Sequence, residues 1–322
     1  MLINTGLRVS ETTHIERWVK CMKIETPLRA LEEVDLLLEA GADIFYCGVL
    51  DKGVNNRNNN IMHQFMTFDE LKKASNIIHK NGKKVFLTLN AINCDFWQCV
   101  KQAENVSADG SIDGVIVADL ELIRILNQLI PNMPVILSCL ACINNSKCLE
   151  VYRLPNVKGY CFERNISIQN MQAIISKNMN LKATAFVSGN CNNTQMICQL
   201  HNLKTKIPLF KQEGGFGELI CENWYCHNQA DESVINLEKM NTNNWCALCA
   251  LHKLQNIGVY ALKIEGRGLA LPYKMQKVRY YRRALDILDQ AEISKYESDC
   301  KKLFFQEYHR KCSIYDCFYP YN

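Results

Sequence analysis

Long apolar runs are missing from this sequence. No stretch of about 18 or more consecutive apolar residues occurs, so no segment has the pattern of a transmembrane helix. The first segment, residues 1–17, also lacks the basic and then apolar order that is typical of a signal peptide. We therefore expect a cytoplasmic protein that does not insert into a membrane.

Several common catalytic motifs are missing as well. The sequence contains no HExxH for a zinc protease, no GxSxG for a serine hydrolase and no Walker loop for a nucleotide phosphate. Its seven histidines show no paired spacing that would suit a metal ion. The glycine-rich segment 214–217 favours a flexible turn over a phosphate cradle. These absences argue against most familiar hydrolase and nucleotide-binding classes.

The composition is that of a chain with a substantial hydrophobic core. Apolar residues make up 48% of the sequence. At 322 residues the chain can form one large domain or two ordinary ones, since α/β barrels alone reach about 250 residues. The net charge of +4 is mild, so a nucleic-acid partner is allowed but not required.

Cysteine is unusually frequent, with 17 residues. An odd number, spread over a long chain without a secretion signal, argues against a disulfide framework and for reduced thiols, some of them metal ligands. Free cysteine also packs well as a small buried side chain. We expect that structural role for Cys21, Cys94, Cys99, Cys142, Cys148 and Cys161.

Strand patterns alternate with helix patterns along the chain. Short apolar or β-branched runs predict eight strands, at residues 18–25, 43–47, 84–90, 114–118, 134–138, 157–162, 182–188 and 260–264. Helices are expected between them, at residues 28–40, 68–80, 96–106, 120–129, 146–154, 168–177 and 245–256. Alternation predicts a parallel sheet, and the count of eight predicts a closed (β/α)8 barrel of the TIM type. A doubly wound parallel sheet is the alternative.

One connection is abnormally long. About 56 residues separate the seventh strand from the next helix, where such loops usually take about 2–6. We therefore expect an N-terminal extension at 1–17, a barrel domain at 18–285 with a cysteine-rich insertion at 189–245, and a C-terminal helix and tail at 286–322. The tail carries Cys312 and Cys317, for which the sequence suggests no role.

The most informative stretch is residues 260–281, YALKIEGRGLALPYKMQKVRYY. It predicts a short strand that ends at two glycines, followed by a basic helix after Pro272. Lys263, Glu265 and Arg267 fall at the carboxyl end of that strand. Charged groups there are badly placed for packing, but in a barrel this is the end that binds ligands.

The same residues carry a family resemblance. LKIEGR (262–267), followed by a tyrosine and a YRRALD helix (281–286), resembles the closing signature of peptidase family U32, the collagenase-like proteases. Further matching segments occur in family order: EAGADIFYCG (39–48), the Arg57-Asn58 pair, HKNGKKVFLTLN (79–90), GVIVADL (114–120) and FERNIS (162–167). The resemblance covers roughly residues 22 to 285 and implies a similar barrel. The family name also covers iron–sulfur, oxygen-independent hydroxylases of tRNA, rRNA and the ubiquinone ring.

The strand ends and the resemblance together give the candidate site residues. We predict catalytic roles for Glu163, Lys263, Glu265 and Arg267. We predict substrate-binding roles for Arg57, Asn90, Asp119, Arg164, Tyr273 and Arg282. Structural alternatives remain open: Asp119 could cap the next helix, and Asn90 could stabilise a turn. Glu163 and Arg164 could also form a salt bridge with each other.

The cysteines of the insertion give the candidate metal ligands. The resemblance implies a [4Fe–4S] cluster held by Cys191, Cys198, Cys221 and Cys246, with Cys226 and Cys249 as alternates. Four soft thiolates suit such a cluster. The sequence departs from the family around the third ligand, because four residues separate Cys221 from Cys226 and the usual Arg-Trp pair lacks its arginine. Zn²⁺ bound by Cys221, Cys226, Cys246 and Cys249 is the competing interpretation.

Three functions follow from these features. The first is an oxygen-independent hydroxylase whose arginines bind anionic groups; the resemblance implies prephenate as an oxygen donor. The second is a U32-type peptidase, with Cys47 or Cys139 as nucleophile. The third is an RNA-modifying protein, redox-active or zinc-stabilised, whose basic helix at 274–283 follows phosphates. The substrate is thus a small molecule, a peptide or RNA, and partners include a similar subunit and an electron donor.

Overall fold

The computed structural model describes most of the chain outside its N-terminal segment and its insertion. The described residues are 22–50, 65, 67–90, 95–188, 246–266, 269–290, 292–313 and 316–319. The expected extension at 1–17 and insertion at 189–245 lie outside these residues. The proposed domain boundaries therefore stay predictions.

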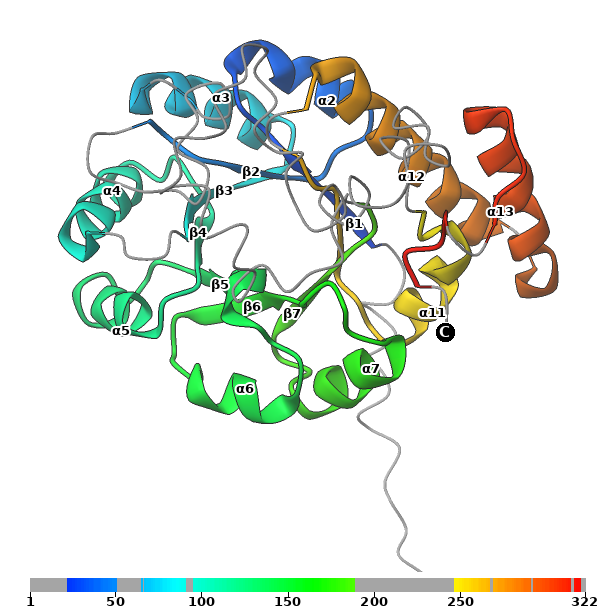
Figure 1. Cartoon of the computed structure of the whole chain (residues 1–322). Coiled ribbons are helices and arrows are strands. Elements are labelled where there is room, and N and C mark those ends of the chain that lie inside the picture. The colour runs from blue at the N-terminus through cyan, green and yellow to red at the C-terminus, as the bar shows by residue number, and fades with distance from the viewer. Residues whose placement is uncertain are drawn as a thin grey trace, which may run out of the picture.

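Eight parallel strands close into a barrel at the centre of the fold (Figure 1). The strands are β1 (Lys23–Pro27), β2 (Ile44–Cys47), β3 (Lys84–Leu89), β4 (Gly114–Val117), β5 (Val135–Leu137), β6 (Val157–Cys161), β7 (Lys182–Phe186) and β8 (Ala261–Lys263). Each strand pairs with the next one along the chain, and β8 closes the ring by pairing with β1. The expected (β/α)8 barrel is confirmed. A doubly wound sheet is excluded, because its two outer strands would remain unpaired.

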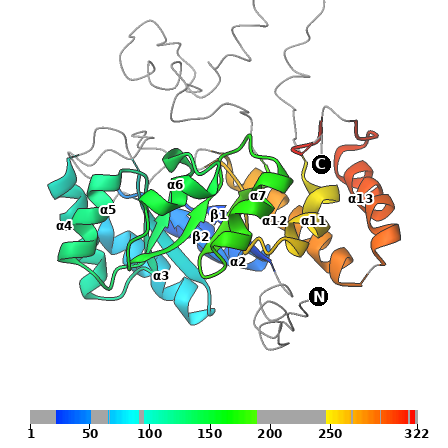
Figure 2. The same cartoon turned by 90° about the horizontal axis from the view of Figure 1, so that it is seen from below.

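Helices surround the barrel, as the two perpendicular views show (Figures 1 and 2). The helical elements are η1 (Leu31–Glu33), α2 (Val34–Glu39), α3 (Phe68–Lys80), α4 (Phe96–Ala108), α5 (Leu120–Leu129), η3 (Cys139–Ala141), α6 (Ser146–Val151), α7 (Ile168–Lys177), η5 (Leu248–Ala250), α11 (Leu251–Asn256), α12 (Leu271–Gln290) and α13 (Ile293–Tyr308). The bounds of α3, α5 and α7 agree with the sequence prediction to the residue.

Polar side chains fix where several of these helices begin. Thr67 accepts a hydrogen bond from the amide of Glu70 at 3.1 Å, and the Glu70 carboxylate accepts one from the amide of Thr67 at 3.2 Å. Asp95 caps α4 and Ser167 caps α7 in the same general way. Each cap contributes about 1 kcal/mol by satisfying amides that have no partner within the helix.

Two expected helices begin later than predicted, because tertiary contacts hold their first residues in other conformations. Ala30 is extended, and the 3₁₀ turn η1 follows it before α2 begins. In the second case Cys246 forms a parallel β-bridge with Cys317, so helical structure starts only at η5. The partner of that bridge is 71 positions away by the residue numbers, which local periodicity cannot reveal.

One glycine is required by close packing at the start of β4. Gly114 has a φ of 154°, and a Cβ at this position would collide with the carbonyl oxygen of Pro134. Any larger side chain would push β4 away from β5, which begins one residue after that proline.

The two C-terminal helices pack on the barrel. Helix α12 contacts β1 and α2, and α13 contacts α12 and η5. Large aromatic side chains fill these contacts, and Tyr280, Tyr281, Tyr296 and Phe304 are each at most 1% exposed. Burying such side chains contributes roughly 1.5–3 kcal/mol each, so these helices share the hydrophobic core.

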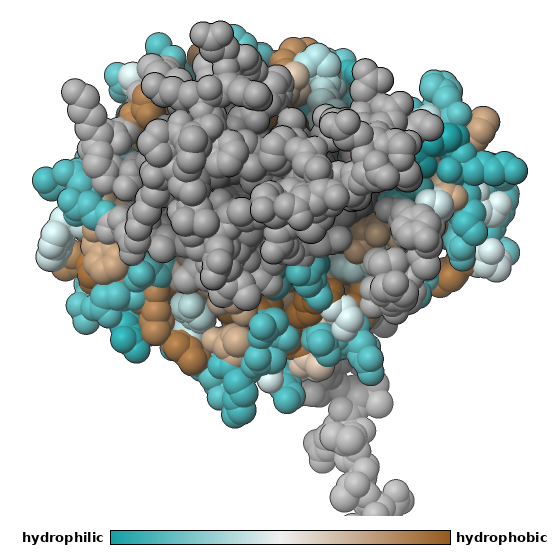
Figure 3. Space-filling view, in the orientation of Figure 1, coloured by the Kyte–Doolittle hydropathy of each residue, from teal (hydrophilic) through white to brown (hydrophobic). Residues whose placement is uncertain are grey.

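The described surface is mainly hydrophilic, with scattered hydrophobic side chains (Figure 3). The large exposed apolar residues are spread over several elements, and only α13 carries two of them: Leu36, Trp97, Leu129, Val151, Met179, Ile293 and Phe305. Among the described helices, none combines the length and the apolar character needed to cross a membrane.

Candidate active site at the carboxyl end of the barrel

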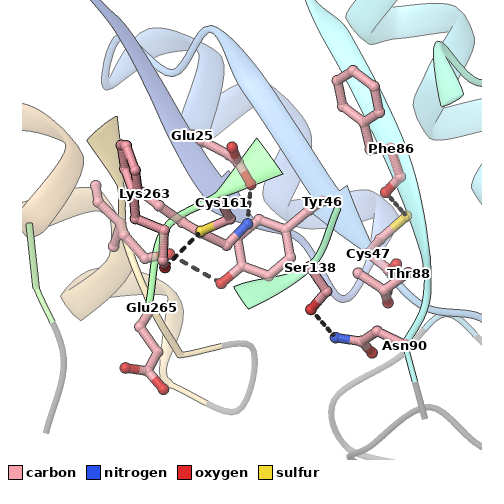
Figure 4. Close-up of polar contacts among 12 residues, drawn as sticks. Glu25, Tyr46, Cys47, Phe86, Thr88, Asn90, Ser138, Cys161, Lys263 and Glu265 are labelled. Carbon is pink, nitrogen blue, oxygen red and sulfur yellow. Dashed lines mark hydrogen bonds and ion pairs between the residues drawn. The ribbon is translucent and has the colours of Figure 1, made fainter. Parts of the chain in front are cut away.

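A buried lysine lies inside the barrel at the end of β8 (Figure 4). The Lys263 ammonium pairs with the carboxylate of Glu25, its register partner on β1, and these side chains are only 10% and 7% exposed. The ammonium also lies 3.7 Å from the ring centroid of Tyr46, whose hydroxyl donates to the carbonyl of Ile264 at 3.0 Å. A buried ion pair adds little net stability after desolvation. Its place at the ligand-binding end therefore favours a role in function.

A second ion pair joins the loops that follow β6 and β8. The guanidinium of Arg164 pairs with the carboxylate of Glu265; the Arg164 side chain is 3% exposed, and that of Glu265 is 29% exposed. Arg164 also lies over the ring of Phe186, 4.8 Å from its centroid. The arginine charge is thus fixed within the protein, while the glutamate stays accessible to a ligand.

Two thiols lie beside these charges. Cys139 follows β5, and Cys161 ends β6. A hydrogen bond from the Cys161 thiol, aided by the positive charges of Arg164 and Lys263, lowers the pKa of Cys139 to about 7, although burial and the nearby Glu163 oppose this shift. Cys139 is therefore partly ionised near neutral pH, and its charge couples to both ion pairs.

Asn90 extends the site toward β3 and β5. Its amide nitrogen donates to the hydroxyl of Ser138 at 3.2 Å, so the side chain bridges two strand ends and does more than stabilise a local turn (Figure 4). Its amide oxygen is buried and has no hydrogen-bond partner among the described residues. Buried acceptors normally have a partner, so this oxygen is a candidate contact for a donor on a ligand.

Asp119 and Tyr273 were both predicted to bind substrate, and the structure gives them different surroundings. Asp119 caps α5, because one carboxylate oxygen accepts from the amides of Glu121 at 2.8 Å and Leu122 at 3.0 Å. Tyr273 on α12 is partly buried; this burial, together with the negative charge of Glu265, raises the pKa of its hydroxyl. The structural alternative thus explains Asp119, whereas Tyr273 lies within electrostatic reach of the site.

Arg282 lies at the opposite end of the barrel. Its guanidinium donates to the carbonyl of Gly41 at 2.6 Å and pairs with Asp43, which immediately precedes β2. Asp43 also accepts from Lys83 at 2.7 Å and from the amide of Ile24 at 3.0 Å. Burial works against ionisation, yet these bonds and charges hold the pKa of Asp43 below its usual value. We therefore leave Arg282 out of the proposed site.

The basic helix is less exposed than its sequence suggests. Lys274 is fully buried in an ion pair with Glu33, and Lys277 donates to the Tyr308 hydroxyl at 2.6 Å. Burial lowers the pKa of Lys277 to about 8. Of the arginines on this helix, Arg279 and Arg283 are exposed. The described side chains of α12 therefore do not form a continuous stripe that could bind phosphates.

Most of the predicted metal ligands lie outside the described residues: Cys191, Cys198, Cys221 and Cys226, as do the predicted Arg57 and Arg267. Cys246 is described. Its sulfur accepts from the amide of Leu248 at 3.5 Å and lies 3.5 Å from the Tyr280 hydroxyl. Donors of this kind stabilise a metal-bound thiolate, so Cys246 fits a soft metal or an iron–sulfur cluster. Burial raises the pKa of the unbound thiol to about 12.

Within the described part of the chain, no three His, Cys, Asp or Glu side chains are arranged so that they could hold a metal ion. The neighbouring Cys300 thiol lowers the pKa of Cys249, the alternate ligand, although burial opposes this shift. The cluster therefore remains a prediction that depends on the undescribed cysteines.

The sequence indicated some members of this site but not their contacts. Tyr46 was not predicted, because a tyrosine in an apolar strand has the pattern of a core residue. Glu25 was predicted as the last residue of the strand at 18–25, which placed it at the ligand-binding edge. Its lysine partner is 238 positions away and could not be predicted.

The family assignment rests on most of the chain. A family model, peptidase family U32, matches residues 29–321. This chain belongs to peptidase family U32. The resemblance noted at LKIEGR is confirmed. Lys263, Arg164 and Glu265 lie within the matched region, whereas Glu25 precedes it.

Individual relatives of this U32 chain carry two kinds of name. The tRNA hydroxylation protein P1 of Bacillus subtilis is 22% identical over 81% of this chain and 62% of its own length. The tRNA hydroxylation protein P of Helicobacter pylori strain J99 is 25% identical over 82% of this chain and 64% of its own length. A collagenase of Porphyromonas gingivalis is 22% identical over 83% and 66% respectively. The chain thus spans less than two thirds of the length of each of these relatives.

Proposed function

We propose that this U32 chain hydroxylates a base of transfer RNA at the carboxyl end of its barrel. The observation that carries the proposal is the buried ion pair between Lys263, the last residue of β8, and Glu25 in the middle of β1. Relatives from Bacillus subtilis and Helicobacter pylori that are named tRNA hydroxylation proteins support the choice of substrate and reaction. A cytoplasmic location belongs to the same proposal, because that is where tRNA is modified.

In this proposal the Lys263–Glu25 pair handles protons. The ammonium can donate a proton and the carboxylate can accept one, and both are held beside the ring of Tyr46. A base must leave its stack to reach such an interior site, and the cost is lowest in a single-stranded loop. We therefore favour a loop nucleotide as the substrate.

The neighbouring polar groups orient the substrate and its oxygen donor. Glu265 is the exposed member of its ion pair and can accept hydrogen bonds from the edge of a base. The free acceptor of Asn90 offers a further contact. Arg164, with the predicted Arg57 and Arg267, would bind the carboxylates of a donor such as prephenate through bidentate contacts. Glu163 and Tyr273 complete the proposed set.

The iron–sulfur cluster remains part of the proposal, with Cys191, Cys198, Cys221 and Cys246 as ligands and Cys226 and Cys249 as alternates. When bound, such a cluster supplies electron transfer, for which an electron donor or a second, similar subunit would be the partner. Zn²⁺ held by Cys221, Cys226, Cys246 and Cys249 is the alternative, and it would make the metal structural.

A peptidase is the second candidate, and one observation favours it. Cys139, with a pKa of about 7, resembles an activated thiol nucleophile. Such a nucleophile usually works with a histidine base. The described histidines have other places: His79 pairs with Asp113 at 3.0 Å, His252 packs on Tyr296, and His309 caps the end of α13. We therefore place hydroxylation ahead of peptide cleavage.

The test is incubation of the full chain, purified and reconstituted with iron and sulfide under anaerobic conditions, with tRNA and prephenate. Digestion to nucleosides and mass spectrometry should find a nucleoside heavier by one oxygen atom. Lys263→Met should abolish the product, whereas the surface control Lys147→Ala should retain it. Cleavage of gelatin without any nucleoside product, sensitive to Cys139→Ala, would replace the proposal with the peptidase.

A further inference from the structure

A small cavity outside the barrel is lined by an unusual number of thiols. Its volume is about 40 Å³, and its other lining residues are largely apolar. The thiols come from five cysteines: Cys246, Cys249, Cys300, Cys312 and Cys317. We refer to this space as the cysteine cavity. Three of its members, Cys300, Cys312 and Cys317, have no place in the proposed function.

Three separate segments of the chain build the cysteine cavity. Cys249 belongs to η5, Cys300 to α13, and Cys312 and Cys317 to the C-terminal segment. The last segment is tied to the first by backbone hydrogen bonds, from the Cys246 amide to the Asp316 carbonyl at 2.7 Å and from the Phe318 amide to the Cys246 carbonyl at 3.0 Å. Figure 1 shows this C-terminal segment beside α11 and α13.

Two of the thiols line the cavity from elements that pack together. Cys249 lies on η5 and Cys300 on α13, and these two elements are in contact. The hydroxyl of Tyr296, one turn before Cys300, donates to the carbonyl of Leu248 at 3.0 Å and holds α13 against η5. Cys300 is 1% exposed, whereas Cys249 is only partly buried. A reagent from solvent therefore reaches Cys249 first, with Cys300 directly behind it.

We propose that Cys249 and Cys300 are a thiol oxidation site and form a reversible disulfide that joins η5 to α13. With oxidised glutathione as oxidant, the Cys249 sulfur attacks the glutathione disulfide and one reduced glutathione leaves. The Cys300 sulfur then displaces the second glutathione. Two protein thiols lose their protons to the two glutathione thiolates, and the two electrons reduce the glutathione disulfide.

The disulfide would fasten the C-terminal helix against the segment that carries Cys246. It closes a loop of about 50 residues, and closing such a loop should raise the melting temperature of a chain of this size by about 6 °C. The bond is reversible because an external thiol such as reduced glutathione can attack it and return both cysteines to thiols. In a reducing compartment such bonds are transient and serve as redox sensors. The inference takes Cys246, and not its alternate Cys249, as the metal ligand.

The experiment treats the purified full-length protein with oxidised glutathione, blocks free thiols with N-ethylmaleimide and maps tryptic peptides by mass spectrometry. Trypsin releases Cys300 alone in peptide 296–301, Cys249 with Cys246 in peptide 240–253, and the tail cysteines in 312–322. We expect peptides 240–253 and 296–301 to be joined, two hydrogen atoms lighter than their sum. Fragment spectra of the joined species should place the bond at Cys249, and dithiothreitol should release it.

Matched variants separate this bond from general oxidation. Cys249→Ser and Cys300→Ser should each lose the joined species and the rise in melting temperature, while Cys148→Ser on the surface of α6 should keep both. Cys300 that stays fully alkylated after oxidation would overturn the proposal. Fragment spectra that place its bond at Cys246 or in the tail would overturn it equally, and neither result depends on a variant that folds.

Discussion

The two ends of the barrel use charge in different ways. At the amino end, Asp43 accepts from Lys83, Arg282 and the amide of Ile24. These bonds tie α12 to the starts of β1, β2 and β3. At the carboxyl end, Lys263 pairs with Glu25 inside the barrel, and Arg164 pairs with a partly exposed Glu265. The first network joins elements of the fold, whereas the second presents charge to a ligand.

This difference explains which charged residues belong in the proposed site. A charge at a strand start is close to the preceding helix, so its partners come from the scaffold. A charge at a strand end faces the loops that bind ligands in barrels of this type. Arg282 and Lys263 belong to the same signature segment of the sequence, yet the fold places them at opposite ends.

The largest effect is expected from breaking the interior ion pair. Lys263→Met should lower the free energy of unfolding by about 3–5 kcal/mol, because Glu25 is left as a buried charge without its partner. Urea unfolding measures this loss. In the double variant Lys263→Met with Glu25→Gln, stability should largely return while tRNA hydroxylation stays absent. Hydroxylation by the double variant would show that the pair is only structural.

The next largest effect is expected at the amino end of the barrel, from removing the charge of Arg282. Arg282→Met should cost about 2 kcal/mol, because Asp43 and the Gly41 carbonyl both lose a charged donor. Hydroxylation per folded molecule should be unchanged. Urea unfolding and nucleoside analysis on the same preparation check both statements, and a strong loss of activity at full stability would return Arg282 to the substrate site.

A smaller effect is expected at Asp119, which lies near the mouth of the barrel but caps α5. Asp119→Ala should cost about 1 kcal/mol and Asp119→Asn only a few tenths, since asparagine also caps helices well. Thermal unfolding distinguishes these two variants. If Asp119→Asn lost tRNA hydroxylation as fully as Asp119→Ala, the negative charge itself would be required, which would support substrate binding by Asp119.

The smallest effect concerns pH. The pKa of Asp43 is lowered in the folded protein, so its contribution to stability is present above the unfolded-state pKa of about 3.9 and is lost as the pH falls through the folded value. The difference in melting temperature between wild type and Asp43→Asn should therefore be constant from pH 6 to about 5 and shrink below about pH 4. A difference that stays constant down to pH 3 would contradict this assignment.

The barrel could be predicted from the sequence because each helix and strand has its own local pattern of apolar residues. The helix at 120–129 has an apolar face after a capping aspartate, and the strand at 114–117 is an uninterrupted apolar run. Arg164 illustrates the limit. Its sequence neighbour Glu163 was a plausible partner, but the structure pairs it with Glu265, 101 positions away by the residue numbers. Ion-pair partners depend on how the barrel closes, which no local pattern contains.

The same limit applies to the lysines of α12. Spacing suggested a solvated or phosphate-binding face, yet Lys274 is fully buried against Glu33 from the other end of the described chain. The sequence also contained no sign that Cys249 and Cys300 line the same cavity. Both depend on the packing of α12 and α13 against segments that are remote in sequence.

The central claim is that charge at the carboxyl end serves chemistry, and Glu265→Gln tests it most directly. Glutamine keeps the size and the acceptor oxygen but removes the charge. We predict that anaerobic incubation with tRNA yields at least about 100-fold less hydroxylated nucleoside than wild type, with a melting temperature within about 3 °C of it. Wild-type amounts of hydroxylated nucleoside from a stably folded Glu265→Gln would contradict the account.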